Sequence, residues 1–325
     1  MSRSRRRHFL VAICGLLGTP LLSFAQAKVA RIGFLFAGTL SQRPQAQGFW
    51  EALKELGYTP GKNVVIEIRE GLGVTERLPQ LAKELVDWKP DVIVAVTPTA
   101  ISAAQRATSS IPIVMAITGD PVRTGFVRNL ARPEGNITGP VVVFDGQVLT
   151  KRLQYLKEMM PSLSQVGFLW NTHNKLSSPD DLQPAAAALG VSVHSLPFQS
   201  PDNLDAALNS AIRNRLQALI VQGDPVTFDR RSSIASFAAR NSLATAYTWT
   251  DEVAAGGLFA YGLSLRKEYR RVAPYVDRLL KGAKPADLPV EQQHKWELFL
   301  NLNTARALGI KFPQSMLAIA AEMTD

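Results

Sequence analysis

Cysteine is almost absent from this chain of 325 residues, because the single cysteine is Cys14. An intramolecular disulfide, a cysteine-based metal site and a catalytic thiol in the body of the chain are therefore excluded. Histidine is scarce as well. His173, His194 and His294 stand far apart and show none of the short spacings that bind metal ions. The sequence thus predicts no metal centre.

Nucleotide-binding and nucleophile motifs are also missing. No G-x-x-x-x-G-K-[ST] loop occurs, and residues 71–73, Gly-Leu-Gly, lack the third glycine of a dinucleotide fingerprint. Residues 262–266 lack the second glycine of a nucleophile elbow. We therefore expect no cofactor and no enzymatic activity.

Clustered positive charge is lacking in the body of the chain. The 36 Lys and Arg against 27 Asp and Glu give a net charge of +9, and four of these cations are Arg3, Arg5, Arg6 and Arg7. A surface that binds nucleic acid normally appears as a basic stripe with interleaved aromatics, and none follows Arg7. We therefore expect no nucleic-acid partner. At ~150 residues per domain, the length suggests two compact units.

The N-terminus is typical of an export signal. Basic residues 1–8 precede an apolar run at 9–17, which extends to Phe24, and the small-residue triplet Ala25-Gln26-Ala27 follows. Gly15, Gly18, Thr19 and Pro20 interrupt the run, which argues against a membrane anchor. Residues 6–10, Arg-Arg-His-Phe-Leu, also resemble a twin-arginine type of export signal, and a lipid on Cys14 is the alternative. We predict cleavage after residue 27, a mature chain that starts at Lys28, and a location in the periplasm.

The rest of the chain alternates between strands and helices in two successive runs. In the first run, strands are expected at 32–36, 64–68, 92–96 and 111–117, and helices from Pro44, at 76–88 and at 99–107. In the second, strands are expected at 166–170, 191–196, 218–221, 243–247 and 257–261, and helices at 149–160, 185–189, 203–213 and 230–241. Such alternation predicts an α/β chain with two similar lobes, each a doubly wound parallel sheet. The lobes are placed at 28–140 and 141–256.

Ligands of such sheets bind beyond the carboxyl ends of the strands. In the first lobe, Thr39, Thr97, Thr99, Ala100, Thr118 and Asp120 follow strands and are candidate ligand-binding residues. Thr97, Thr99 and Ala100 place hydroxyls and free N–H groups at a helix N-terminus, which favours an anion such as a carboxylate. The alternative is that Thr97 or Thr99 only caps the helix, and that Asp120 caps a turn.

In the second lobe, the candidates that follow strands are Asn171, Asp224 and Tyr247. Asp224 could pair with the ammonium group of a ligand, or it could cap a turn before Pro225. Tyr247 and Trp249 could form an apolar wall, or they could belong to the core. We predict a ligand with a carboxylate and an ammonium group, held from opposite lobes.

Several stretches of the mature chain resemble those of a known protein family. The matching stretches include 48–49, LKELGY at 53–58, GKNV at 61–64, KPDVIV at 89–94, IPIV at 111–114, GDPV at 119–122, LARPEGNITG at 130–139, KGAKPADLPV at 281–290 and NLNTARALGI at 301–310 with Pro313. Together they resemble the ABC-transporter substrate-binding proteins of the tryptophan-binding-like group, which have the type I periplasmic-binding fold. Two segments depart from the usual pattern of this family, Gly223-Asp224-Pro225 and Thr97-Pro98-Thr99. The resemblance therefore does not identify the ligand.

The resemblance implies a receptor that captures a small solute, delivers it to an ABC permease in the inner membrane and works as a monomer. Some relatives handle aromatic amino acids. It also implies a hinge between the lobes and several crossings of the chain, so that residues 257–285 would complete the first lobe and 286–325 the second. A sensor domain that signals to a membrane kinase, and a hydrolase or transferase on a similar scaffold, are the alternatives.

Overall fold

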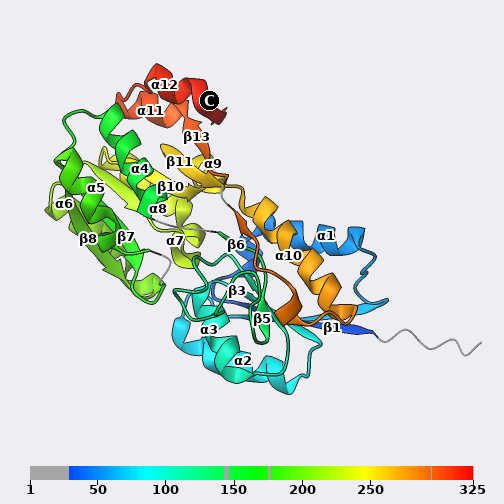
Figure 1. Cartoon of the computed structure of the whole chain (residues 1–325). Coiled ribbons are helices and arrows are strands. Elements are labelled where there is room, and N and C mark those ends of the chain that lie inside the picture. Colours follow the sequence, from blue (N-terminus) through cyan, green and yellow to red (C-terminus); the bar gives the residue numbers. More distant parts are fainter. Residues whose placement is uncertain (1–28, 143–145, 175–176, 294, 325) are drawn as a thin grey trace, which may run out of the picture.

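The computed structural model describes residues 29–142, 146–174, 177–293 and 295–324, and it shows two α/β lobes (Figure 1). Residues 1–27, predicted to be an export signal, lie outside the described residues. The first lobe contains a sheet of order β2-β1-β3-β4-β5, in which all paired strands are parallel. Its strands are β1 Ala30–Phe36, β2 Val64–Glu70, β3 Val92–Val96, β4 Ile113–Ala116 and β5 Ile137–Thr138.

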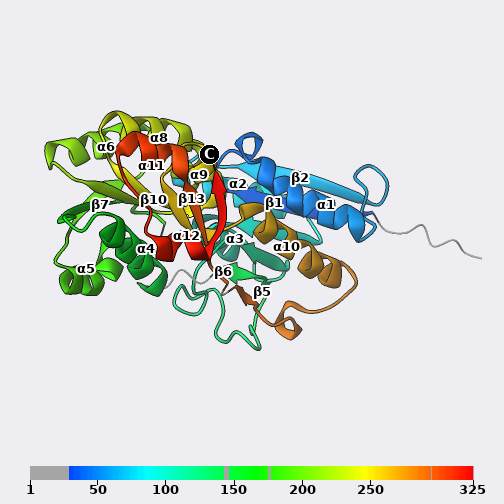
Figure 2. The ribbon, with the colours of Figure 1, turned by 90° about the horizontal axis from the view of Figure 1, so that it is seen from above.

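Helices cover both faces of this sheet because apolar residues recur on one side of each helix. One face is packed by α1 Gln47–Glu55 and α10 Leu265–Leu280, which lie side by side (Figure 2). The other face is packed by α2 Leu78–Asp87 and α3 Pro98–Ala107. The strand β3 between them is buried along its whole length, as its continuous apolar run predicts.

The second lobe contains a sheet of order β14-β13-β11-β10-β9-β7-β8. Its strands are β7 Gln165–Asn171, β8 Ser192–Phe198, β9 Ala218–Val221, β10 Ala244–Trp249, β11 Phe259–Leu263, β13 Glu297–Asn301 and β14 Ala320–Thr324. One face is packed by α4 Gly146–Met159, α5 Gln183–Leu189, α11 Leu302–Leu308 and α12 Gln314–Ile319. The other is packed by α6 Leu204–Arg213, α8 Arg231–Arg240 and α9 Thr250–Ala254.

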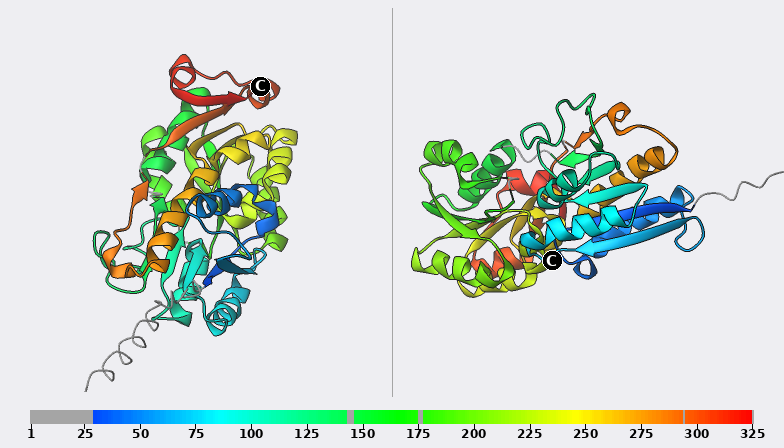
Figure 3. Two further views of the ribbon diagram at one scale, coloured as in Figure 1. Left: turned by 90° about the vertical axis from the view of Figure 1, so that its right-hand side faces the viewer. Right: turned by 90° about the horizontal axis from the view of Figure 1, so that it is seen from below.

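The predicted class, two doubly wound lobes with parallel-sheet cores, is confirmed. The second sheet has one antiparallel pairing, which the sequence did not indicate, between β13 and β11. The physical reason is that the chain re-enters the second lobe from the first and therefore meets the sheet from the opposite end. Figure 3 shows the two lobes from two further directions, with the C-terminal strand at the outer edge of the second.

The described elements of residues 29–324 alternate between the lobes in such an order that the chain changes lobe three times. The first passage follows β6 Val141–Val142, the second lies at Ser264 between β11 and α10, and the third follows β12 Gln292–Gln293. β6 and β12 pair in parallel, so the chain lies side by side where it enters the first and third passages. The second passage comes later than the expected residue 257, because β11 still pairs with β10 in the second sheet. Among the described residues, no helix is long and apolar enough to cross a membrane.

Candidate functional site

A cleft of ≈ 950 Å³ separates parts of the two lobes. Its first-lobe wall includes Pro98, Thr99, Ser102, Arg106, Arg123 and Phe126. Its second-lobe wall includes Trp170, Thr172, His173, Ser177, Ser178 and Asp180. Binding sites for small molecules typically have volumes of about 300–1,000 Å³. The cleft is therefore large enough for a small solute.

The N-terminal end of α3 forms one side of this cleft. The N–H groups of Thr99 and Ala100 have no partner within a helix that starts at Pro98, and the side chain of Thr97 does not cap them. Thr99, Ser102 and Arg106 follow the spacing of one helix face, and all three line the cleft. Arg106 Nη1 donates to Ser102 Oγ at 2.6 Å. This wall offers donors and positive charge, which suit an anion.

The facing wall is built from the residues that follow β7. Trp170 is half-buried, and its Nε1 donates to Ser195 Oγ at 2.9 Å, which fixes the indole against the sheet. Asp181 accepts from the backbone N–H of Ser178 at 2.7 Å and caps its own turn, whereas Asp180 beside it is exposed. This wall therefore offers an aromatic face and negative charge.

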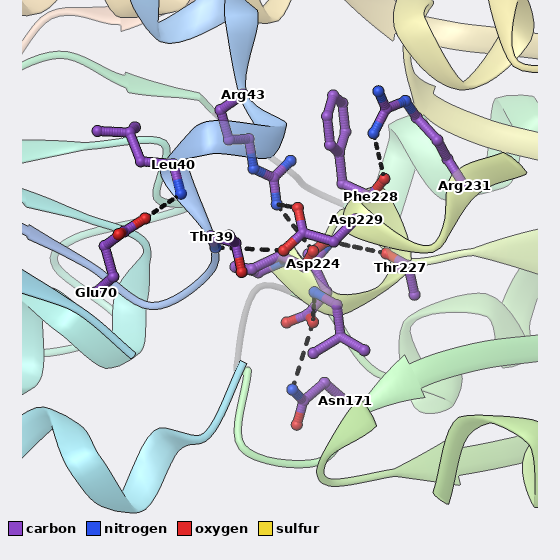
Figure 4. Close-up of polar contacts among 12 residues, drawn as sticks. Thr39, Leu40, Arg43, Glu70, Asn171, Asp224, Thr227, Phe228, Asp229 and Arg231 are labelled. Carbon is purple, nitrogen blue, oxygen red and sulfur yellow. Dashed lines mark hydrogen bonds and ion pairs between the residues drawn. The ribbon is translucent and has the colours of Figure 1, made fainter. Parts of the chain in front are cut away.

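The lobes touch beside the cleft, where the ends of β1, β3 and β4 meet those of β9 and β10. A small cavity of ≈ 20 Å³ remains there, room for about one water molecule. Arg43 follows β1 in the first lobe and reaches α7 Pro225–Asp229 in the second (Figure 4). Its Nη2 lies 2.9 Å from Asp229 Oδ1, a close charge contact, and donates to the carbonyl of Pro225 at 2.8 Å. Burial lowers the pKa of Arg43 and raises that of Asp229, while the attraction between them opposes both shifts.

Asp224 is buried and begins α7. Its Oδ1 accepts from the N–H of Val226 at 2.9 Å, and its Oδ2 accepts from Asn174 Nδ2 at 2.9 Å. Asn171 Nδ2 makes a longer contact of 3.4 Å with Oδ1. Burial raises the pKa of Asp224, and these hydrogen bonds act in the opposite direction. Both carboxylate oxygens are thus engaged by protein donors, as the capping alternative predicts.

The other predicted residues fall into different environments. Thr99 lines the large cleft, while Thr97 and Asp224 line the small cavity. The N–H of Thr39 reaches Asp229 Oδ2 at 3.3 Å across the lobes, and Asn171 accepts from the N–H of His173 at 3.0 Å.

Thr118 and Ala100 are fully buried. Asp120 caps a turn by accepting from the N–H groups of Val122 and Arg123 at 2.9 and 3.1 Å.

Tyr247 lines neither the large cleft nor the small cavity. It is fully buried in the apolar core beneath α8 and α9, whereas Trp249, two residues later, lines the small cavity. Sequence reasoning also passed over Arg43 and Arg106. A lone arginine in a loop carries no signal of burial, but the spacing of Thr99, Ser102 and Arg106 could have been recognised.

Comparisons with known proteins agree on the type of molecule. A family model described as "ABC transporter substrate binding protein" matches residues 38–324. A curated "Tyrosine-binding protein" of Clostridioides difficile is 26% identical over 267 residues, 82% of this chain and 76% of that protein. Among solved structures, a conserved domain protein from Vibrio cholerae has a TM-score of 0.84 with 24% identity, covering 91% of this chain and all of that one. A Streptococcus pneumoniae ABC domain in complex with L-Trp has a TM-score of 0.82 with 24% identity, covering 90% and 99%.

Proposed function

Because this chain belongs to the ABC transporter substrate-binding protein family and is therefore a solute-binding protein, we propose that it captures an aromatic, amino-acid-like solute in the cleft. The solute is then handed to an ABC permease. The tyrosine-binding relative and the L-Trp complex support this class of solute. The observation that carries the proposal is the pairing of a donor-rich helix end in one wall with an indole in the other.

In the proposed pose, the solute's carboxylate accepts from the N–H group of Thr99 at the start of α3 and lies near the side chains of Ser102 and Arg106 on the same wall. The aromatic ring lies against Trp170 and Phe126, both of which line the cleft. The ammonium group points to the second lobe, where Asp180 is exposed, rather than to Asp224, whose oxygens are already engaged. Of the predicted residues, Thr99 would touch the solute, while Ala100 lies buried behind it and Thr97, Asn171 and Asp224 would shape the floor.

The proposal also covers the setting in which the protein works. The family is extracytoplasmic, and the basic, apolar and small-residue segments of residues 1–27 support removal of these residues on export to the periplasm. Intact-mass measurement of the periplasmic protein should give a chain that starts at Lys28. Retention of Met1 or a lipid on Cys14 would refute this part. We also propose that the protein is a monomer and leaves its solute chemically unchanged.

The solute class can be tested by calorimetric titration with matched compounds. L-Tyrosine and L-tryptophan should bind, whereas tyramine, which lacks the carboxylate, and 3-(4-hydroxyphenyl)propionate, which lacks the ammonium group, should each bind about tenfold more weakly or worse. Mass spectrometry of material released by mild denaturation should identify the same class of solute, unaltered after incubation. Equal affinity for tyrosine and tyramine would refute the carboxylate subsite.

A further inference from the structure

Arg43 belongs to the first lobe, but most of its guanidinium contacts are with the second. Its Nη2 donates to the carbonyl of Pro225 at 2.8 Å and lies 2.9 Å from Asp229 Oδ1, and the guanidinium carbon lies 4.0 Å from the centre of the Phe228 ring. All three residues belong to α7, and only 4% of Arg43 is exposed (Figure 4). None of these four residues lines the large cleft. The lobes therefore share a buried ion pair that lies outside the proposed solute site.

Apolar rings surround this ion pair from both lobes. Phe228 and Trp249 of the second lobe are 0% and 3% exposed, and they belong to one apolar cluster with Phe36 and Tyr269 of the first. Separating the lobes would expose these rings and break the ion pair at the same time. An unpaired charge is costly only where it is buried, so the pair stabilises the lobes specifically when they are together.

The arrangement of the lobes agrees better with a solute-loaded relative than with an empty one. The Streptococcus pneumoniae domain in complex with L-Trp has a TM-score of 0.82 over 90% of this chain, at 24% identity. The ligand-free, open structure of a substrate-binding protein from Clostridium difficile has a TM-score of 0.62 over 91% of this chain, at 22% identity. Since nearly the same share of the chain is compared, the contacts between the lobes fit a solute-bound form.

We propose that Arg43 is a positioning residue for solute capture, whose ion pair with Asp229 forms as the lobes close over a solute and holds them closed until the solute leaves. Arg43 acts through the lobes and does not touch the solute. It therefore slows the dissociation of every solute by a similar factor. Association is unaffected, because a solute enters while the lobes are apart. This inference rests on the proposed function.

Stopped-flow kinetics with L-tyrosine and L-tryptophan test the proposal. Truncating one partner of a buried ion pair acts mainly on dissociation, so Arg43→Ala should raise the dissociation rate about 30-fold or more for both solutes. The association rate should stay within about threefold of the wild type. Asp229→Asn, which preserves side-chain volume, should act in the same direction. The double variant should be no worse than Arg43→Ala, because both changes break one interaction.

Arg231→Ala is the matched control. Arg231 also stacks on Phe228, at 4.5 Å, and donates to its carbonyl at 2.8 Å, but entirely within the second lobe. Its dissociation rates should match those of the wild type. Circular dichroism confirms that each variant is folded, and Asp229→Asn serves if Arg43→Ala does not fold. Wild-type dissociation rates in a folded variant, or a slower association in place of a faster dissociation, would overturn the proposal.

Native mass spectrometry separates this inference from the proposed function. It follows the fraction of purified protein that still carries bound solute during dialysis, whatever the identity of that solute. If the wild type carries a solute but binds neither amino acid, the proposed solute class is wrong, and faster loss from Arg43→Ala than from the wild type would still support the positioning role. Equal loss would overturn that role. A wild type that carries no solute and binds neither amino acid would refute the proposed function and this inference with it.

Discussion

Thr97 and Ile117 end neighbouring strands and both have positive backbone φ angles, of 86° and 51°. The strands β3 and β4 are paired with Val96 opposite Ala116, so the two unusual residues lie at one level of the sheet, and both line the small cavity between the lobes. β-Branched residues rarely adopt such angles. With a ψ of 153°, Thr97 lies in a region occupied almost only by glycine. Two residues with unusual backbone angles therefore lie side by side at the small cavity, and Thr97 directly precedes the start of α3.

Thr97→Gly should stabilise the protein. Glycine adopts a φ of 86° without steric conflict, and relief of strain should outweigh its greater freedom in the unfolded chain by ~1 kcal/mol. Urea unfolding measures the change. Thr108→Gly at the other end of α3 is the control, because Thr108 has a φ of −151° and accepts from the N–H groups of Ser110 and Ile111. Thr108→Gly should lose stability. A loss of stability in both Thr108→Gly and Thr97→Gly would show that Thr97 is unstrained.

Much of the fold could be predicted because most elements carry a strong periodic pattern. The bounds of β3 and β9 agree with the predicted runs at 92–96 and 218–221. The long helix α10 was not predicted as such, and it contains Pro274, a residue that normally interrupts helices. The short α7 and α9, of five residues each, are too brief for a helical period to be recognised.

The site was harder to predict, as Tyr247 and Trp249 illustrate. Residues two apart on a regular strand face the same side, so a regular strand would place both in one environment. The pairing of β10 with β11 shifts in register between these two residues, and such a bulge re-aims a side chain. Tyr247 therefore enters the core, while Trp249 lines the small cavity. A bulge of this kind depends on the neighbouring strand, which the local sequence does not specify.

Asp224→Ala should lower stability by about 2–3 kcal/mol. It removes the cap of α7 and leaves the buried amide of Asn174 without its carboxylate acceptor. Asp120→Ala is the matched control, since Asp120 also caps a turn but is partly exposed, and ~1 kcal/mol or less is expected there. Chemical unfolding and solute titration should be run on both. A stable Asp224→Ala that no longer binds solute would instead assign Asp224 to the ammonium group.

Glu252 should make the protein less stable as the pH rises. It is fully buried in α9, and its Oε2 accepts from the N–H groups of Thr248 and Trp249 at 3.1 and 2.9 Å. Burial raises its pKa from 4.5 to about 7, although these N–H groups and the charge of Arg152 favour the ionised form. Between these values the folded state retains a proton that the unfolded chain has released. Its contribution to the free energy of unfolding is therefore complete below pH 4.5 and is lost by about pH 7, a change of roughly 3 kcal/mol.

Glu252→Gln checks this assignment, because the amide oxygen can still accept the two N–H groups but does not titrate. Unfolding curves at a series of pH values should show a shallower decline for Glu252→Gln than for the wild type. Glu55→Gln is the control, since Glu55 is exposed and pairs only at the surface with Arg270. A wild-type slope in Glu252→Gln would place the titration in another group.

Trp170→Ala should weaken binding of aromatic solutes about tenfold or more, because the indole supplies an aromatic face and apolar area to the cleft wall. The loss should be larger for L-tyrosine than for L-leucine, since only the former has a ring to pack against the indole. Trp88→Ala is the matched control: Trp88 is also partly buried, but it stacks under Arg31 at 4.1 Å and does not line the cleft. Its titrations should match the wild type. Equal losses for tyrosine and leucine in Trp170→Ala would mean that the indole shapes the cleft without contacting the ring, and the proposed pose would then be wrong.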